Sequence, residues 1–261
     1  MAFGIVDMSV IPVRQEPSER GELATQLLFG ELYEVVETAG KWLRVMSLSG
    51  GDEGWMEAGR HKAVDETYVN RYRASDQLVV DEVFQVVRET GDWESRLVVA
   101  GSVLPFYDAY RKTFQVGDAE YSLLGGTREV GLDDVRDLLV QYALMYYNTP
   151  YLWRGRTPYG VDAAGLTRMA YRLAGVSLPG SVEEQVLQGQ PLAFVEEALP
   201  GDLAFFGDAS GAISHVGMLW QPGRIIHASG RVRVDKLDHH GIFNETTKRY
   251  THALKLIKRY I

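Results

Sequence analysis

The chain has 261 residues, of which 46% are apolar, and it carries a formal net charge of -8. That length is typical of two or three domains with ordinary apolar cores. The negative charge argues against nucleic acid or an anionic membrane surface as the main partner. The sequence contains no cysteine, which excludes disulfides, thiolate metal sites and a thiol nucleophile in the chain as written.

Targeting signals are not evident. Residues 1–13 lack a basic cluster followed by a long apolar run, so we see no signal peptide. No stretch approaches the roughly 20 apolar residues of a membrane span. We therefore expect no membrane span and a cytoplasmic location, or a periplasmic or secreted one if the chain is a trimmed mature form.

The first half of the chain is predicted to be rich in β-strands. Short runs of alternating apolar and polar residues, separated by Gly, Pro and Ser turns, predict strands over 5–13, 32–37, 42–46, 83–88 and 96–99. Residues 37–42 and 89–93 share a pattern of strand, acidic-Gly turn and Trp. This repetition predicts two small β-barrels in tandem, over residues 1–65 and 76–130.

Helical periodicity begins at Asp133, and either Asp133 or Asp134 can cap this helix. Thr149-Pro150 is expected to end it. A second helix is predicted over 163–173, ending before Gly175. Ser181 and Glu184 form a capping box for a third. Strands are then predicted over 203–206, 213–220, 224–228, 232–234 and 253–258. Helices followed by an antiparallel sheet give an α+β domain over 131–261.

The candidate catalytic groups lie at the start of the second predicted helix and on two later strands. Ala163 follows Asp162 at the positive end of the helix dipole, a position that stabilises an anionic nucleophile. If the strands that carry His215 and His227 pair as a hairpin, the two imidazoles can face the same side. A nucleophile, a base and an orienting group then form the general arrangement of a catalytic triad.

Several motifs in the second half agree in order and spacing with one family. They are Tyr151, Trp153 and Gly155, then Asp162, Gly165 and Leu166, then Pro200-Gly201-Asp202-Leu203, His215-Val216-Gly217 and Ile226-His227-Ala228. This stretch resembles an NlpC/P60 domain, the papain-like family that cuts cell-wall peptides. The resemblance implies helices packed on an antiparallel sheet, preceded by SH3-type barrels. One position departs, because Ala163 stands where the family has its nucleophilic cysteine.

The whole arrangement is similar to γ-D-glutamyl-L-diamino acid endopeptidases that process freed muropeptides. The resemblance implies a peptidoglycan-derived partner, L-Ala-γ-D-Glu-diamino acid with a free N-terminal L-Ala, and no cofactor. It implies that His215 is the base and His227 its orienting group. It also implies a set of substrate-binding residues, which are Tyr151, Trp153, Asp162, Ser181, Ser214 and Glu16.

Other interpretations of these residues stay open. Asp162 and Ser181 can be plain helix caps, Tyr151 and Trp153 plain core aromatics, and His227 a core histidine. His239 and His240, placed on a strand, are expected to face opposite sides, which argues against a metal site. Ala163 is compatible with an inactivated variant, a natural relative that lost the chemistry, or a redesigned sequence. The chain as written is expected to bind without cleaving; a binding module and a different acyl hydrolase or amidase are the alternatives.

Overall fold

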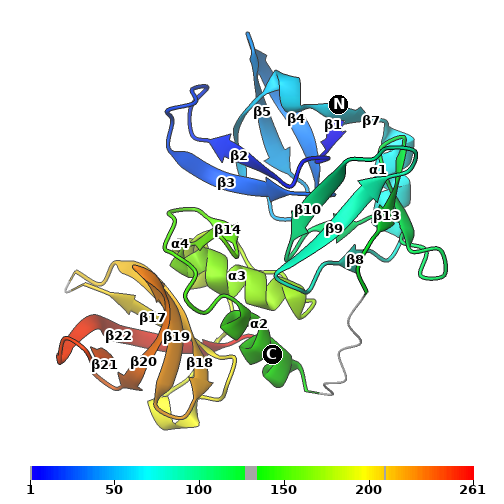
Figure 1. Cartoon of the computed structure of the whole chain (residues 1–261). Helices are drawn as coiled ribbons and strands as arrows, with labels where there is room; N and C mark the ends of the chain where they lie inside the picture. Colours follow the sequence, from blue (N-terminus) through cyan, green and yellow to red (C-terminus); the bar gives the residue numbers. More distant parts are fainter. Residues whose placement is uncertain (1, 127–133, 209) are drawn as a thin grey trace. The chain divides into compact units, whose positions relative to one another are not determined.

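The computed structural model describes residues 2–126, 134–208 and 210–261. The chain divides into two compact units, Met1–Glu129 and Val130–Ile261 (Figure 1). The predicted cap Asp133, and residues 127–130 of the second predicted barrel, lie outside the described residues. Among the described residues, no helix has the length and apolar character that crossing a membrane requires.

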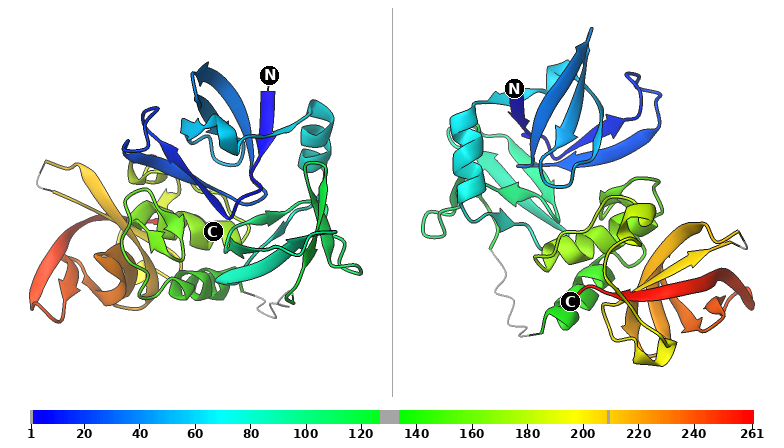
Figure 2. Two further views of the ribbon diagram at one scale, coloured as in Figure 1. Left: turned by 45° about the horizontal axis from the view of Figure 1, so that its top comes forward. Right: turned by 180° about the vertical axis from the view of Figure 1, so that it is seen from behind.

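The N-terminal unit begins with a seven-stranded antiparallel sheet in the order β3-β2-β6-β5-β4-β1-β7. Figure 2 shows the first strands of this unit in blue, from two further sides. Its strands are β1 Ala2–Ile5, β2 Val10–Arg14, β3 Leu23–Leu28, β4 Leu32–Ala39, β5 Trp42–Ser47, β6 Glu53–Glu57 and β7 Lys62–Val64, with a 3-10 turn over Ala58–Arg60. The single strand predicted over 5–13 is wrong. The chain bends between β1 and β2, because β1 pairs with β4 and β7 whereas β2 pairs with β3 and β6.

A second part of this unit follows a helix that the strand-like periodicity did not predict. The helix is α1, Glu66–Ala74, and Asp65 caps it by accepting the Tyr68 N–H. A four-stranded sheet in the order β10-β9-β13-β12 and the pair β11-β8 come next. These strands are β8 Leu78–Val79, β9 Phe84–Glu89, β10 Ser95–Val99, β11 Val103–Leu104, β12 Thr113–Val116 and β13 Ala119–Leu123.

One apolar cluster joins the two parts of the N-terminal unit. Phe29, from the loop between β3 and β4, makes edge-to-face contacts with Phe114 and Tyr121, which are on β12 and β13. Phe3 and Ile5 of β1 belong to the same buried cluster. The two parts therefore share one buried cluster, and the first sheet also has a cluster of its own. The interpretation of the second part as a separate SH3-type barrel stays a prediction.

The C-terminal unit begins with its helices, which are α2 Val135–Met145, α3 Ala163–Leu173 and α4 Val182–Gln185. Asp134 caps α2 through the Arg136 N–H. That helix ends at Met145, earlier than the predicted stop at Thr149-Pro150, and Asn148 adopts a positive φ of 68° in the turn that follows. The bounds predicted for α3 are confirmed.

The rest of the unit is a sheet in the order β16-β22-β17-β18-β19-β20-β21, and β22 also pairs with β21. This extra pairing closes the six strands β17 to β22 into a barrel. The strands of this sheet are β16 Gln190–Pro191, β17 Leu203–Gly207, β18 Ile213–Gln221, β19 Arg224–Ser229, β20 Arg231–Asp238, β21 Gly241–Asn244 and β22 Arg249–Arg259. A separate short pair, β14 Arg156–Thr157 and β15 Gly160–Val161, precedes α3. A 3-10 turn over Val195–Glu197 lies between β16 and β17.

The inner face of this barrel is apolar over most of its length and polar at one end. Leu219, Ile225 and Leu237, from β18, β19 and β20, belong to one buried cluster. Side chains alternate between the two faces of a strand, so His215 lies on the same face as Leu219, His227 on that of Ile225, and Asp235 on that of Leu237. The barrel thus brings three polar side chains together next to its core.

Candidate active site

Position 163 is the first residue of α3, and Asp162 is the cap of that helix. The Asp162 carboxylate accepts the Gly165 N–H at 2.6 Å and the Arg154 N–H at 2.9 Å. The predicted capping role is therefore confirmed. Burial raises the pKa of Asp162, although the two N–H groups and the Arg154 charge act in the opposite direction. Asp162 fixes both the start of α3 and the loop before it.

A small open pocket lies beside the start of α3. Eleven residues line it, including seven that the sequence predicts for the site, namely Tyr151, Trp153, Asp162, Ala163, Ser181, Ser214 and His215, together with Arg154, Ala164, Val182 and Glu183. Tyr151 and Trp153 are 39% and 49% exposed, so they are not plain core aromatics. Position 163, the His215 imidazole and the predicted substrate-binding side chains of this unit thus share one pocket.

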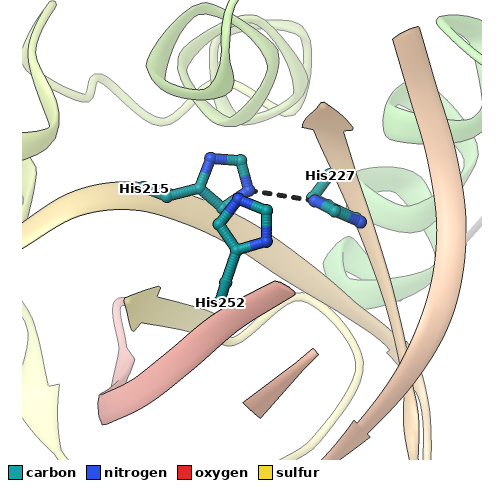
Figure 3. Close-up of side chains that lie close together, drawn as sticks. All are labelled: His215, His227 and His252. Carbon is teal, nitrogen blue, oxygen red and sulfur yellow. Dashed lines mark hydrogen bonds between the residues drawn. The ribbon is translucent and has the colours of Figure 1, made fainter. Parts of the chain in front are cut away.

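The two histidines come from antiparallel strands, and Gly217 of β18 lies opposite His227 of β19. Their rings are hydrogen-bonded, with His215 Nε2 at 2.9 Å from His227 Nδ1 (Figure 3). A Cβ added to Gly217 would lie 2.9 Å from the His227 Cβ, so the glycine leaves room for that side chain. The predicted hairpin, with both imidazoles on one side, is confirmed.

A carboxylate that the sequence interpretation missed continues this pair. His227 Nε2 lies 3.1 Å from Asp235 Oδ2, and Arg233 Nε lies 2.6 Å from the same oxygen. Burial of Asp235 favours its protonated form, but hydrogen bonds from His227 and Arg233 outweigh this and lower the pKa of Asp235. The sequence Arg233-Val-Asp235-Lys-Leu237 could have indicated Asp235, because the alternation of side chains along a strand places this acidic residue on the same inward face as Leu237.

The order of these contacts fixes the ring protons. An ionised carboxylate only accepts hydrogen bonds, so His227 carries its proton on Nε2 and uses Nδ1 as an acceptor. His215 must then donate from Nε2, which leaves the lone pair of His215 on Nδ1. Burial, and then the nearby His252 and His227, hold the pKa of His215 well below its usual value. His215 is therefore a neutral imidazole that can accept a proton on Nδ1.

A third imidazole, missed because no motif includes it, packs on His215. The His252 ring, from β22, stacks on the His215 ring with centroids 4.2 Å apart and planes 25° apart (Figure 3). Burial, and then the nearby His227, lower the pKa of His252 to about 4. The three histidines offer nitrogens within 4.8 Å of one another. However, nearly parallel stacked rings do not direct their in-plane lone pairs at one ion, so this arrangement is poorly suited to a metal.

The prediction that His239 and His240 face opposite sides of a strand is wrong. They lie in the turn between β20 and β21, with ring centroids 3.9 Å apart. Together with Asp238 they form a second group whose geometry a metal ion could use, but both histidines are exposed. The turn lets neighbouring side chains converge, whereas a regular strand would separate them.

The remaining predicted residues differ in placement. Ser181 caps α4, because its Oγ accepts the Glu184 N–H at 3.2 Å and donates to the Glu184 carboxylate at 2.9 Å. The predicted cap is therefore confirmed, but the Glu184 carboxylate binds the Ser181 hydroxyl and not the backbone N–H that a capping box uses. Ser214 is an exposed residue of β18 that lines the pocket. Glu16 is exposed in the N-terminal unit, between β2 and β3, and its contribution to the site stays a prediction.

Comparison with known proteins assigns one domain in each half of the chain. Residues 148–252 match the NlpC/P60 family, and residues 13–59 match the bacterial dipeptidyl-peptidase SH3 domain. A γ-D-glutamyl-L-lysine dipeptidyl-peptidase of Bacillus subtilis is 25% identical over 224 residues, which cover 79% of this chain and 72% of that protein. A probable endopeptidase of Mycobacterium tuberculosis is 38% identical over 110 residues, which cover 41% of this chain and only 27% of that protein.

The fold agrees with a solved structure over the full length. A crystal structure of an NlpC/P60 family protein from Bacillus cereus has a TM-score of 0.81 and 20% identity, and the alignment covers 99% of both chains. That similarity establishes the fold alone. The sequence matches show that this chain carries an NlpC/P60 domain over residues 148–252 and a bacterial SH3 domain over residues 13–59.

Proposed function

We propose that the C-terminal unit is a γ-D-glutamyl-L-diamino acid endopeptidase domain for peptidoglycan-derived peptides with a free N-terminal L-Ala. In this chain Ala163 replaces the nucleophile, so the protein binds such peptides without cleaving them. The observation that carries the proposal is the hydrogen-bonded series His215, His227 and Asp235 beside position 163. The name of the Bacillus subtilis relative supports the substrate class.

The chemistry of a chain with cysteine at position 163 follows from this arrangement. The thiolate attacks the γ-D-Glu carbonyl carbon, forms a thioester and breaks the amide bond. His215 has accepted the thiol proton on Nδ1 and gives it to the departing amine. The backbone N–H groups at the start of α3 stabilise the oxyanion. Water, deprotonated by His215, then attacks the thioester and restores the thiol.

The proposal is tested by restoring the nucleophile. An Ala163→Cys variant is incubated with L-Ala-γ-D-Glu-diaminopimelate, and the expected products are L-Ala-γ-D-Glu and the free diamino acid. Ala163→Ser is the matched control, since it changes the same buried position without supplying a thiol. A folded cysteine variant that leaves this peptide intact would contradict the endopeptidase assignment.

A second candidate function is recognition of peptidoglycan peptides without turnover. It is favoured by the chain as written, because Ala163 cannot attack a carbonyl while the pocket and the polar series beside it are complete. Calorimetry of the unaltered chain with the same peptide distinguishes the two. Tight binding combined with an inactive Ala163→Cys variant supports the binding protein. A cytoplasmic location and a part in muropeptide recycling belong to the proposal and are tested by fractionation of the source cells.

A further inference from the structure

Arg154 has a backbone conformation that arginine rarely adopts. Its φ is +59°, in the left-handed region that glycine enters without strain. In this conformation its N–H donates to Asp162 Oδ2 at 2.9 Å. Glycine would provide the same N–H at lower conformational cost, so the backbone contact does not account for an arginine at this position. A strained residue that lines a pocket points to a role for its side chain.

The Arg154 charge acts on the nearby Asp162 carboxylate, but the guanidinium has no close anionic partner among the described residues. The guanidinium lies over the Trp153 ring, 5.3 Å from the centroid, and the part of the chain that the structure describes gives it no hydrogen bond or ion pair. The nearby Asp162 carboxylate is occupied by two backbone N–H groups. The ring thus holds a half-buried cation, without a close ion pair among the described residues, in the pocket that Ala163 and His215 also line.

The chemistry of the proposed substrate supplies a matching anion. A glutamate linked through its γ-carboxyl group keeps its α-carboxylate free, four bonds from the carbonyl carbon of the scissile amide. Guanidinium groups bind carboxylates through two parallel N–H···O bonds, a geometry that an amide does not reproduce. Arg154 is the one Lys or Arg among the residues found to line this pocket. Asp162 and Glu183 line the same pocket, so a carboxylate bound there depends on the Arg154 guanidinium as its one cationic partner among these residues.

We propose that Arg154 binds the free α-carboxylate of the γ-linked glutamate, so that the pocket selects this acid over its α-carboxamide. The proposal rests on the proposed function and names the form of peptide that the site accepts. Arg154 then determines specificity, and its stacking on Trp153 keeps the guanidinium in place before the peptide arrives.

The test compares two peptides on the unaltered chain by calorimetry. They are L-Ala-γ-D-Glu-diaminopimelate and the same peptide with the α-carboxylate converted to a carboxamide. Arg154→Gln removes the charge and keeps a long polar side chain, and Arg154→Gly removes the side chain while relieving the positive φ. Both keep the backbone N–H. Arg249→Gln is the control, since Arg249 is exposed on β22 and does not line the pocket.

A charge-assisted hydrogen bond corresponds to about a ten-fold change in affinity or more. We expect the unaltered chain to prefer the acid by about that factor. Arg154→Gln and Arg154→Gly should lose this preference by weakening acid binding only, and Arg249→Gln should retain it. An unchanged preference in both Arg154 variants overturns the role of Arg154 and leaves the proposed function intact. Absence of binding of either peptide to the unaltered chain overturns both.

Discussion

Asp235 accepts a hydrogen bond from the His227 Nε2–H at 3.1 Å and thereby sets the direction of the next hydrogen bond, in which His215 Nε2 donates to His227 Nδ1. Both residues are buried, with Asp235 3% and His227 1% exposed, so water does not compete for these protons. The carboxylate determines which nitrogen of His215 carries the lone pair, although it does not touch His215 itself. Asp235 is therefore a positioning residue.

Replacing the Asp235 carboxylate should disturb the tautomers of His227 and His215 without changing the residues that line the pocket. Asp235→Asn can present either a carbonyl or an NH₂ group to His227, so the Nε2–H tautomer is no longer enforced. In the Ala163→Cys background we expect kcat to fall by at least about ten-fold with a smaller change in KM. Nitrogen NMR of the unaltered chain should show the Nε2–H form of His227, and a mixture in Asp235→Asn.

Arg233→Gln is the control for this experiment, because it removes a charge next to Asp235 and leaves the acceptor for His227 in place. Its effect on the His227 tautomer should be small. An identical tautomer in the Asp235→Asn protein would show that the carboxylate does not orient the histidine pair.

The cap of α3 should make a measurable contribution to stability. Asp162→Ala leaves the Gly165 and Arg154 N–H groups without their acceptor, and the loss of a helix cap costs about 1–2 kcal/mol. Asp162→Asn retains one side-chain oxygen and should cost less. Urea unfolding of the two variants at pH 7 checks this order, and equal free energies of unfolding would show that capping is not what Asp162 contributes.

The sequence predicts those structural features that depend on residues close together in the chain. The bounds of α3 were predictable because the Asp162 cap and Gly175 lie within a few residues of the helix. The pairing of β18 with β19 was predictable because only a short turn separates the strands. The motif residues then located His215, His227 and the pocket without reference to the rest of the chain.

Asp235 was missed although the alternation of residues on β20 was a local signal, whereas His252 could not be placed from local sequence. His252 reaches His215 because β22 pairs with β17 and with β21, which closes the barrel, and such long-range pairing leaves no mark in a short window of sequence. The shared core of the N-terminal unit was missed for the same reason, since Phe29 and Phe114 lie far apart in the chain. Short strands with alternating residues indicate a β-rich unit, but they do not reveal which strands enclose one core.

The histidine cluster should make the protein sensitive to acid. The pKa of His252 is about 4 in the folded chain, below the value of about 6.5 in an unfolded one. Between these values the unfolded chain binds a proton that the folded chain does not, so stability falls as the pH drops from 6.5 to 4. His215 and His227 pack against the His252 ring. Burial is the largest effect that disfavours protonation of His252, His227 acts in the same direction, and Asp235 acts in the opposite direction.

His252→Gln cannot take up that proton and should therefore show a weaker pH dependence. Urea unfolding at pH 7, 5.5 and 4.5 measures it. His240→Gln, which changes an exposed histidine in the turn after β20, is the matched control and should behave like the unaltered chain. A His252→Gln protein as acid-sensitive as the unaltered chain would assign the effect to other groups.

A thiol at position 163 should ionise at unusually low pH. It would lie at the N-terminus of α3, where the helix dipole stabilises an anion, and it would share the pocket with the lone pair of His215 Nδ1. Transfer of the thiol proton to that nitrogen gives an ion pair, which offsets the burial that disfavours a charged His215. The thiolate should then persist well below the usual cysteine pKa of about 8.5.

Alkylation of Ala163→Cys by iodoacetamide between pH 5 and 9 reports this ionisation directly, since the chain has no other cysteine. We expect the rate at pH 6 to exceed that of an Ala163→Cys, His215→Ala double variant by about ten-fold or more. The double variant retains the helix dipole, so the difference between the two profiles isolates the imidazole. Coincident profiles would mean that His215 does not accept the thiol proton, and the proposed base would have to be abandoned even if the peptide binds.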